Sequence, residues 1–371
     1  TTIVAINTQR DDQEPAYETI LLGATSSMYV SLNNIYVTFT EWRAITLSSI
    51  ALPEGMATTN DFEKTTIHRI HIEDGEIEYN ADGEVPGRVL NQFSMDEYQG
   101  YFRIATTAGN TWEAASQNNL YILDGNLEII ASLEGLAPGE QIYSARFMGE
   151  RCYLVTFRQI DPLFVIDLED PYEPEVLGQL KITGYSNYLH PYDETHVLGI
   201  GKETVAAEEG DFAWYQGVKI SLFDVSDVAN PVEIAKYEIG DRGTDSPVLS
   251  DHKALLFDKE KNLLVIPVLV AEIDERQYPY GVTPDAYGEY VWQGAYVFNI
   301  SLEEGLQLKG TITHCENFSE LWQKDYYYYD FSACSIQRSL YIENVLYTIS
   351  EAKVKMNSLE NLAEINEVEL S

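Results

Sequence analysis

The sequence predicts an all-β fold, and within that class a β-propeller of about seven four-stranded blades whose first blade is incomplete. The helical period of apolar residues is nearly absent, and short runs rich in Val, Ile, Tyr, Phe and Thr alternate with clusters of Gly, Asn, Asp and Pro. One strand motif also recurs along the chain. The stretches between its copies have room for four strands each, which is the size of a propeller blade.

The recurring motif is clearest at residues 164–171, where the sequence reads Phe-Val-Ile-Asp-Leu-Glu-Asp-Pro. Its closer and looser echoes are 4–7, 69–72, 121–124, 222–227, 297–301 and 354–358. They lie about 58 residues apart on average, a longer period than the ~40–50 residues of WD or kelch repeats. In the best-defined repeat, the strands a to d are predicted at 141–147, 151–157, 163–168 and 174–182.

These repeats predict one propeller domain over residues 1–371, with a half blade in 1–24 and about six blades in 25–371. Residues 1–24 have the pattern of strands c and d only, so the inner half of this blade is missing or comes from elsewhere. The alternative architecture is a β-sandwich, or a pair of them, since sandwiches share the strand composition.

The charge of the chain excludes one class of partner. Sixty acidic and 23 basic residues give a formal net charge of −37, and no Lys and Arg cluster is present to neutralise phosphates. A nucleic-acid-binding surface is therefore excluded, and adhesion to an anionic membrane is disfavoured. The longest apolar run, 263–271, contains Pro267 and has the length of a buried strand, so no membrane-spanning helix is predicted.

The long insertions are predicted to emerge from one face of the propeller. Residues 41–64, 107–118, 203–217 and 272–294 join strands b and c, and 314–334 joins one blade to the next. All five tryptophans fall in these loops: Trp42, Trp112, Trp214, Trp292 and Trp322. Further rings lie beside them at Phe212, Tyr215, Tyr278, Tyr280, Tyr287, Tyr290 and Tyr326 to Tyr329. Large aromatic side chains on loops favour a binding surface, and the alternative is a set of small local cores that hold the loops closed.

Chemistry in a central channel would use side chains at the starts of the inner strands, which are Ser94, Arg146, Asn187, Asp251, His252 and Arg338. Asp251 and His252, in a predicted inner strand, are the candidates for an acid/base pair, and the alternative is a pair that braces adjacent blades. The segment 190–196 carries two histidines and two acids, which predicts a hydrogen-bonded turn rather than a zinc site. A specific metal cannot be assigned, although the acidity makes calcium binding a candidate property.

Three cysteines and two sequons bear on the compartment. Cys152 lies in an apolar strand and is predicted to be a buried free thiol. Cys315 and Cys334 bracket a Tyr-rich loop and are the candidates for a disulfide, although spacing alone leaves that pairing open. Asn299 and Asn317 are candidate glycosylation sites, and these two sequons fit a secreted chain. The absence of an initiator Met is expected to reflect a removed leader or a partial chain.

Several longer stretches resemble a known family. They are Leu90–Tyr98, Arg146–Arg151 continuing to Asp161–Asp167, Tyr188–Asp193, Trp214–Gly217, and Asp251–Ala254 through Ile266–Val268. Together they resemble the secreted archaeal and bacterial proteins that carry a C-terminal β-propeller distantly related to WD repeats. The resemblance implies an exported protein with a propeller fold, and additional strand-rich sequence before the first residue. It implies no activity and no catalytic residue.

These observations predict an extracellular binding or scaffold module whose aromatic loop face holds a protein, a glycan or a cell-surface polymer. The binding residues would be Trp42, Trp112, Trp214, Tyr215, Trp292 and Trp322, with Arg146, Asn187 and Arg338 at the channel. One alternative is a hydrolase or lyase in which Asp251 and His252 act as acid and base and Arg146 holds an anionic group. A second alternative is a calcium-stabilised component of a surface layer.

Overall fold

The computed structural model describes residues 2–6, 14–19, 27–42, 63–110, 115–158, 161–207, 212–323, 328–329 and 332–370. The chain forms two compact units. Unit 1 comprises residues 1–158 and 162–179, and unit 2 comprises 159–161 and 180–371. The described part of the chain has no helix with the length and apolar composition needed to cross a membrane.

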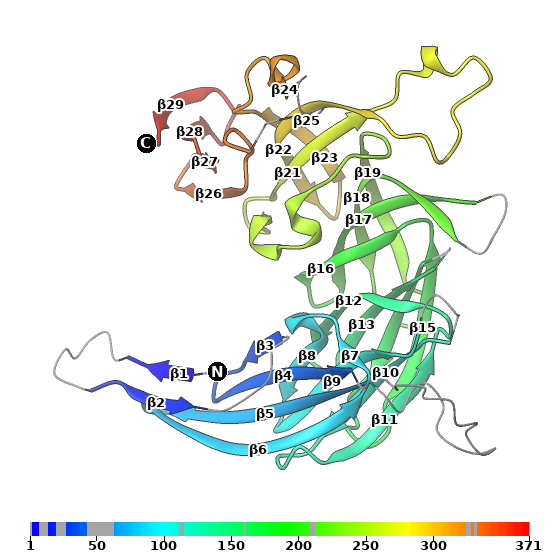
Figure 1. The fold of residues 1–371 in the computed structure, drawn as a ribbon, viewed down its shortest axis with the longest axis vertical. Helices are drawn as coiled ribbons and strands as arrows, with labels where there is room; N and C mark the ends of the chain where they lie inside the picture. The colour runs from blue at the N-terminus through cyan, green and yellow to red at the C-terminus, as the bar shows by residue number, and fades with distance from the viewer. Residues whose placement is uncertain are drawn as a thin grey trace, which may run out of the picture. The chain divides into compact units, whose positions relative to one another are not determined.

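Unit 1 begins with a two-stranded hairpin and continues with a series of antiparallel sheets (Figure 1). The hairpin is β1 (Thr2–Ala5) and β2 (Ala16–Thr19), and the first four-stranded sheet is β3 (Ser27–Val30), β4 (Asn34–Trp42), β5 (Glu63–Glu73) and β6 (Glu76–Pro86). The next contains β7 (Arg88–Val89), β8 (Met95–Tyr98), β9 (Tyr101–Ala108), β10 (Gln117–Leu123) and β11 (Ile129–Leu136). The last contains β12 (Gln141–Met148), β13 (Arg151–Phe157), β14 (Asp161–Asp167) and β15 (Glu175–Ile182). In each four-stranded sheet the spatial order equals the chain order, because every connection is a hairpin.

Unit 2 repeats the same arrangement. Its first sheet is β16 (Tyr185–Asp193), β17 (His196–Ala206), β18 (Ala213–Asp224) and β19 (Val232–Ile239). Its second is β20 (Leu256–Asp258), β21 (Leu263–Glu272), β22 (Glu289–Ser301) and β23 (Gly305–Ile312). A short hairpin of β24 (Trp322–Gln323) and β25 (Tyr328–Tyr329) precedes the sheet β26 (Arg338–Ile342), β27 (Val345–Ile349), β28 (Lys353–Ser358) and β29 (Glu364–Glu369).

Neighbouring sheets pack face to face through their central strands. In unit 1, Tyr36 of β4 stacks on Phe102 of β9 with ring centroids 4.2 Å apart, and Ile122 of β10 belongs to the same core cluster as Leu154 of β13. In unit 2, Val297 of β22 shares a cluster with Leu346 of β27. A central strand covered on both faces, such as β21, is almost entirely apolar, whereas outer strands such as β19 alternate between exposed and less exposed side chains.

Consecutive four-stranded antiparallel sheets that stack face to face are the blades of a β-propeller. The prediction of an all-β fold built from such blades is therefore confirmed. The number of about seven blades and the division of 1–371 into a half blade and six full ones stay predictions.

Two predicted inner-strand segments are instead short 3₁₀ helices. Asp251 and His252 were expected in an inner strand, but Asp251 caps a 3₁₀ helix at His252–Ala254, and β20 begins only at Leu256. The Asp251 side chain accepts a hydrogen bond from the Lys253 backbone N–H at 3.0 Å, and such local bonds compete with sheet pairing. Ser94 likewise ends the 3₁₀ helix Gln92–Ser94, whose cap is Asn91.

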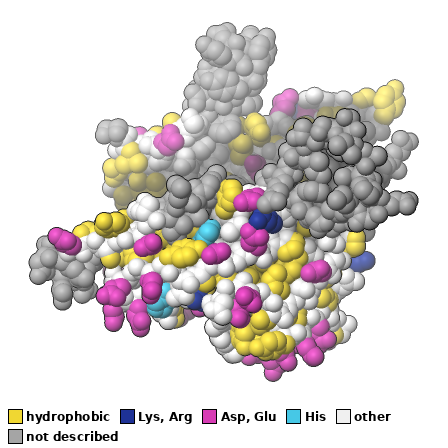
Figure 2. All heavy atoms as spheres, turned by 60° about the horizontal axis from the view of Figure 1, so that its bottom comes forward, with side chains coloured by type: hydrophobic (Ala, Val, Ile, Leu, Met, Phe, Trp, Pro, Cys, Tyr) yellow, Lys and Arg dark blue, Asp and Glu magenta, His cyan; other side chains and the backbone are white. Residues whose placement is uncertain are grey.

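Acidic side chains are spread over the face drawn in Figure 2, among patches of apolar ones, and few basic side chains are visible there. This distribution agrees with the net charge of −37. Strong like charge favours solubility and disfavours contact with other polyanions.

Candidate functional site

The four tryptophans within the described residues lie in strands rather than in loops, which corrects the sequence-based assignment. In unit 2, the b–c hairpins extend the sheets beyond their other strands, so that Trp214 of β18 pairs with Val205 and Trp292 of β22 pairs with Val270. A register shift accompanies each extension, and an irregularity of this kind lets a ladder continue with a changed twist. Trp42 is the last residue of β4 and Trp322 the first of β24, whereas Trp112 lies outside the described residues.

A buried arginine joins the two extended hairpins of unit 2. Arg242 lies in the connection from β19 to β20 and is only 5% exposed. Its guanidinium carbon is 4.6 Å from the ring centroid of Trp214, 4.8 Å from that of Tyr215 and 4.3 Å from that of Tyr287. Aromatic faces are negative, so a desolvated cation enclosed by three of them is stabilised electrostatically as well as by packing.

Hydrogen bonds complete this junction. The hydroxyls of Tyr215 and Tyr287 lie 3.0 Å apart, and Arg242 donates to the Tyr287 hydroxyl at 3.3 Å. The Gln216 side-chain amide donates to the Pro284 carbonyl at 3.0 Å, and the Gly288 N–H donates to the Arg242 carbonyl at 2.8 Å. The hydrogen bonds from Tyr215 and then Arg242 lower the pKa of Tyr287. The long hairpin 273–288 is thus fixed to the hairpin before it.

A glycine permits the close approach on which this junction depends. A Cβ at Gly217 would lie 2.1 Å from the Gly240 carbonyl oxygen, a distance at which backbone would have to move. Gly240 itself has φ +61°, in the left-handed region that favours glycine. Two glycines therefore allow the chain to turn next to β18 and carry Arg242 between the rings.

The same hairpins expose aromatic rings to solvent. We call this set the aromatic surface, and its members are Phe212, Tyr215, Tyr280, Tyr287 and Tyr290. Tyr280 is fully exposed in a turn closed by the Gly281 N–H bonding to the Tyr278 carbonyl at 3.0 Å. Phe212 meets Trp214 edge to face at 4.9 Å. Trp214 therefore has a structural role beside Arg242, while the rings around it remain accessible.

Sequence reasoning named most of these rings but missed Arg242. The segment Gly240-Asp241-Arg242-Gly243 carries no motif, and its contact with Tyr287 spans 45 residues of sequence. The available signal was an arginine between glycines, placed between two aromatic-rich insertions in a chain with few basic residues.

The inner-strand candidates form cross-sheet contacts. In unit 2, Arg338 of β26 forms an ion pair with the Asp251 carboxylate. Because Asp251 lies in the connection between β19 and β20, the pair links that connection to the first strand of the last sheet. The interpretation of Asp251 as a brace has this direct support, and its catalytic role stays a prediction. The His252 ring lies 6.1 Å from that of Tyr188, whose hydroxyl is 3.0 Å from His190 Nδ1.

The two remaining channel candidates, Asn187 and Arg146, differ in the contacts of their polar groups. Asn187 lies in β16, and its side-chain oxygen is buried without a hydrogen-bond partner. In unit 1, the Arg146 guanidinium of β12 lies over the Phe93 ring at 4.9 Å. The binding roles proposed for these two residues stay predictions.

In the segment 190–196, the end of β16 and the start of β17 are joined by a turn at Glu194 and Thr195, and hydrogen bonds to Asp193 hold this turn. His196 Nδ1 lies 2.8 Å from one carboxylate oxygen of Asp193, and Lys259 donates to the other at 2.7 Å. Among the described residues, no group of three or more His, Cys, Asp and Glu side chains is arranged to hold a metal ion. Calcium binding stays a prediction.

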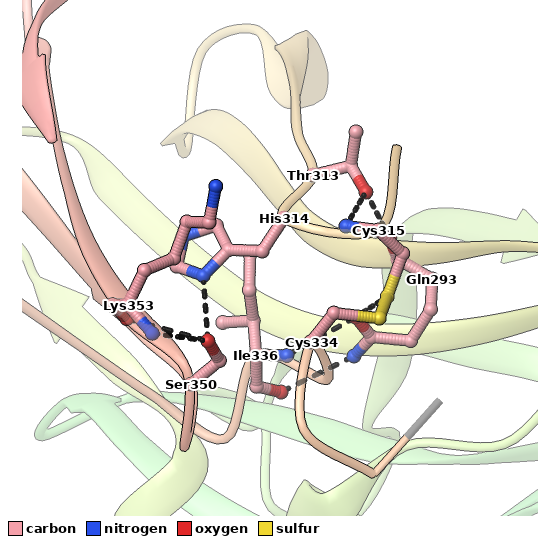
Figure 3. Close-up of a disulfide and its surroundings, with 8 residues drawn as sticks. All are labelled: Gln293, Thr313, His314, Cys315, Cys334, Ile336, Ser350 and Lys353. Carbon is pink, nitrogen blue, oxygen red and sulfur yellow. Dashed lines mark hydrogen bonds between the residues drawn. A yellow bond between two sulfur atoms is a disulfide. The ribbon is translucent and has the colours of Figure 1, made fainter. Parts of the chain in front are cut away.

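A disulfide joins Cys315 to Cys334 and closes the connection that contains β24 and β25 (Figure 3). Gln293 lies beside it, accepting a hydrogen bond from the Ile336 N–H at 3.1 Å. Cys152 is buried and free, and burial raises the pKa of its thiol to about 12. Asn299 and Asn317 are both exposed, and their glycosylation stays a prediction.

His314, next to the disulfide, is buried and kept neutral (Figure 3). Its Nδ1 lies 2.9 Å from the Ser350 hydroxyl and its Nε2 lies 2.9 Å from the Thr348 hydroxyl. Burial, and then the charges of Lys355 and Lys353, lower the pKa of His314 from 6.5 to about 4.

The free energy of unfolding should therefore fall as the pH is lowered from 7 to 5. Over this range the unfolded chain binds a proton at His314 that the folded chain excludes, which corresponds to about 2 kcal/mol. Urea unfolding at several pH values measures this slope. The His314→Gln variant should lose that part of the slope, and an unchanged slope would contradict the assignment.

The family described as "Beta propeller domain" matches residues 1–362. An uncharacterised protein of Methanocaldococcus jannaschii is 35% identical over 311 residues, which cover 83% of this chain and 41% of that protein. An uncharacterised protein of Archaeoglobus fulgidus is 43% identical over 203 residues, covering 54% of this chain and 30% of that protein. The chain thus spans less than half the length of these relatives.

Among solved structures, the crystal structure of BamB from Moraxella catarrhalis aligns with a TM-score of 0.42 and 11% identity. The alignment covers 81% of this chain and 72% of that one.

Proposed function

Because the chain belongs to the β-propeller domain family, we propose that it is an extracellular binding or scaffold module whose aromatic surface holds a partner. The observation that carries this proposal is the combination of exposed rings with the rigid junction at Arg242 beneath them. Rings fixed before binding lose little conformational entropy when a partner covers them, so each can contribute most of its contact energy.

The extracellular setting is supported by the disulfide between Cys315 and Cys334, since such bonds persist in oxidising compartments. The exposed sequon residues Asn299 and Asn317 are compatible with that compartment. The proposed partner is a protein, a glycan or a cell-surface polymer.

Replacing Tyr280 and Tyr290 by serine should reduce capture of the partner at least about five-fold, because exposed interface aromatics each contribute about 1 kcal/mol or more. The bait is the purified protein on a support, and the sample is a surface extract separated into protein and glycan fractions. The melting temperature should remain within about 2 °C of the parent value, since both side chains are exposed.

The matched control is Tyr172→Ser in unit 1, which removes a ring that is 61% exposed and distant in sequence from the aromatic surface. This variant should capture the partner like the parent protein. Equal capture by the parent and the Tyr280/Tyr290 variant would show that the aromatic surface is not the binding site.

A further inference from the structure

The segment that carries Tyr280, Tyr287 and Tyr290 of the aromatic surface also carries exposed carboxylates and few cations. Between residues 272 and 291 the exposed acids are Glu272, Glu275, Asp285 and Glu289. The only basic residue of that segment is Arg276, and its guanidinium is already paired with Asp274 through bonds of 2.7 and 3.0 Å. The other arginine of the junction, Arg242, is buried. The surface therefore offers ring faces and negative charge together.

Arg242 shows how rings of this hairpin pair accommodate a guanidinium group. Its planar cation lies within 5 Å of three ring centroids and also donates a hydrogen bond to the Tyr287 hydroxyl. Tyr215 and Tyr287 contact this internal cation and are nevertheless exposed on the outside. An aromatic face attracts a cation wherever solvent can be displaced, and guanidinium stacks on rings better than ammonium does.

We propose that the aromatic surface binds an arginine-rich segment of a protein partner, an inference that rests on the proposed function and specifies its partner. Guanidinium groups would stack on the exposed tyrosines and pair in a two-pronged manner with Glu275 and Glu289. The charge of −37 would attract such a segment from a distance and repel anionic polymers. A neutral glycan could stack on the rings but would gain nothing from the long-range field.

Two fluorescent peptides of equal length test this inference, one alternating arginine and glycine and one with citrulline in place of every arginine. Citrulline keeps the shape of the side chain and removes its charge. Fluorescence anisotropy at low and at high salt should show the arginine peptide binding at least about tenfold more tightly than the citrulline peptide, with an advantage that shrinks as salt is added.

The variants separate a defined site from general attraction to an acidic protein. Two double variants should each lower the affinity for the arginine peptide about five-fold. One is Tyr280→Ser with Tyr290→Ser, and the other is Glu275→Gln with Glu289→Gln. The charge-matched control, Glu169→Gln with Glu173→Gln in unit 1, removes two exposed carboxylates elsewhere and should leave the affinity within about two-fold.

Equal weakening by the control pair, or equal affinity for the two peptides, would overturn the inference. The proposed function would survive that result if the Tyr280/Tyr290 variant still failed to capture a partner from the glycan fraction. If the Tyr280/Tyr290 and Glu275/Glu289 variants lose arginine-peptide binding and the control pair does not, the result supports both the inference and the proposed function.

Discussion

The Arg242→Ala variant should unfold with a free energy about 3 kcal/mol below that of the parent protein. The truncation removes a cation enclosed by three rings, and a desolvated cation–π contact alone contributes about 2 kcal/mol. It also removes the hydrogen bond to the Tyr287 hydroxyl and leaves a cavity between Trp214 and Tyr287 that the two hairpins must close. Urea unfolding, followed by tryptophan fluorescence, measures the change.

Two further variants determine what the loss means. Arg242→Lys keeps the charge but not the planar group that fits between the rings, so it should lose an intermediate amount. Arg276→Ala removes an arginine whose side chain is 89% exposed and paired with Asp274, and it should change the stability by about 0.5 kcal/mol or less. If Arg242→Ala were as mild as Arg276→Ala, the junction would not stabilise the hairpins, and the case for a preorganised aromatic surface would fail.

The blade pattern could be predicted because three of the sheets contain a third strand that is rich in apolar residues. The clearest copy of the recurring motif begins in β14 at Phe164, and the copies at Leu222 and Val297 begin in β18 and β22. These are third strands, flanked by partners on both edges and covered on both faces. A short run of Val, Ile and Phe is the direct consequence of that position.

The candidate site was less predictable for two reasons. Some of its contacts join residues far apart in the sequence, and one segment forms a local hydrogen bond that replaces a predicted strand. The rings were visible in the composition of the insertions, but the contact of Arg242 with Tyr287 depends on two blades lying side by side. The segment at Asp251 was misassigned because of a local interaction, not a long-range one. An inner strand was predicted there, whereas the hydrogen bond from the Lys253 N–H to the Asp251 side chain favours a 3₁₀ helix.

Removing the disulfide should lower the free energy of unfolding by about 3 kcal/mol, both in the Cys315→Ser, Cys334→Ser double variant and in the reduced parent protein. The bond joins residues 19 positions apart, and opening a loop of that length restores this much conformational entropy to the unfolded chain. The measurement is the thermal or urea unfolding transition with and without reductant. The double variant should give one curve under both conditions, and Cys152→Ala should retain the reductant-dependent shift of the parent.

The folded structure should nevertheless persist without this bond, because a second interaction holds the same point of the chain. Gln293 of β22 accepts from the Ile336 N–H and donates to the Ile336 carbonyl at 3.3 Å, just beyond Cys334. Loss of the disulfide therefore frees the connection between β23 and β26 while its far end stays anchored, so the reduced protein should unfold at a lower temperature but still cooperatively. A parent protein whose transition ignored reductant would show that the bond contributes nothing to stability. If reduction instead abolished the transition, Gln293 would not be the second anchor that its two hydrogen bonds indicate.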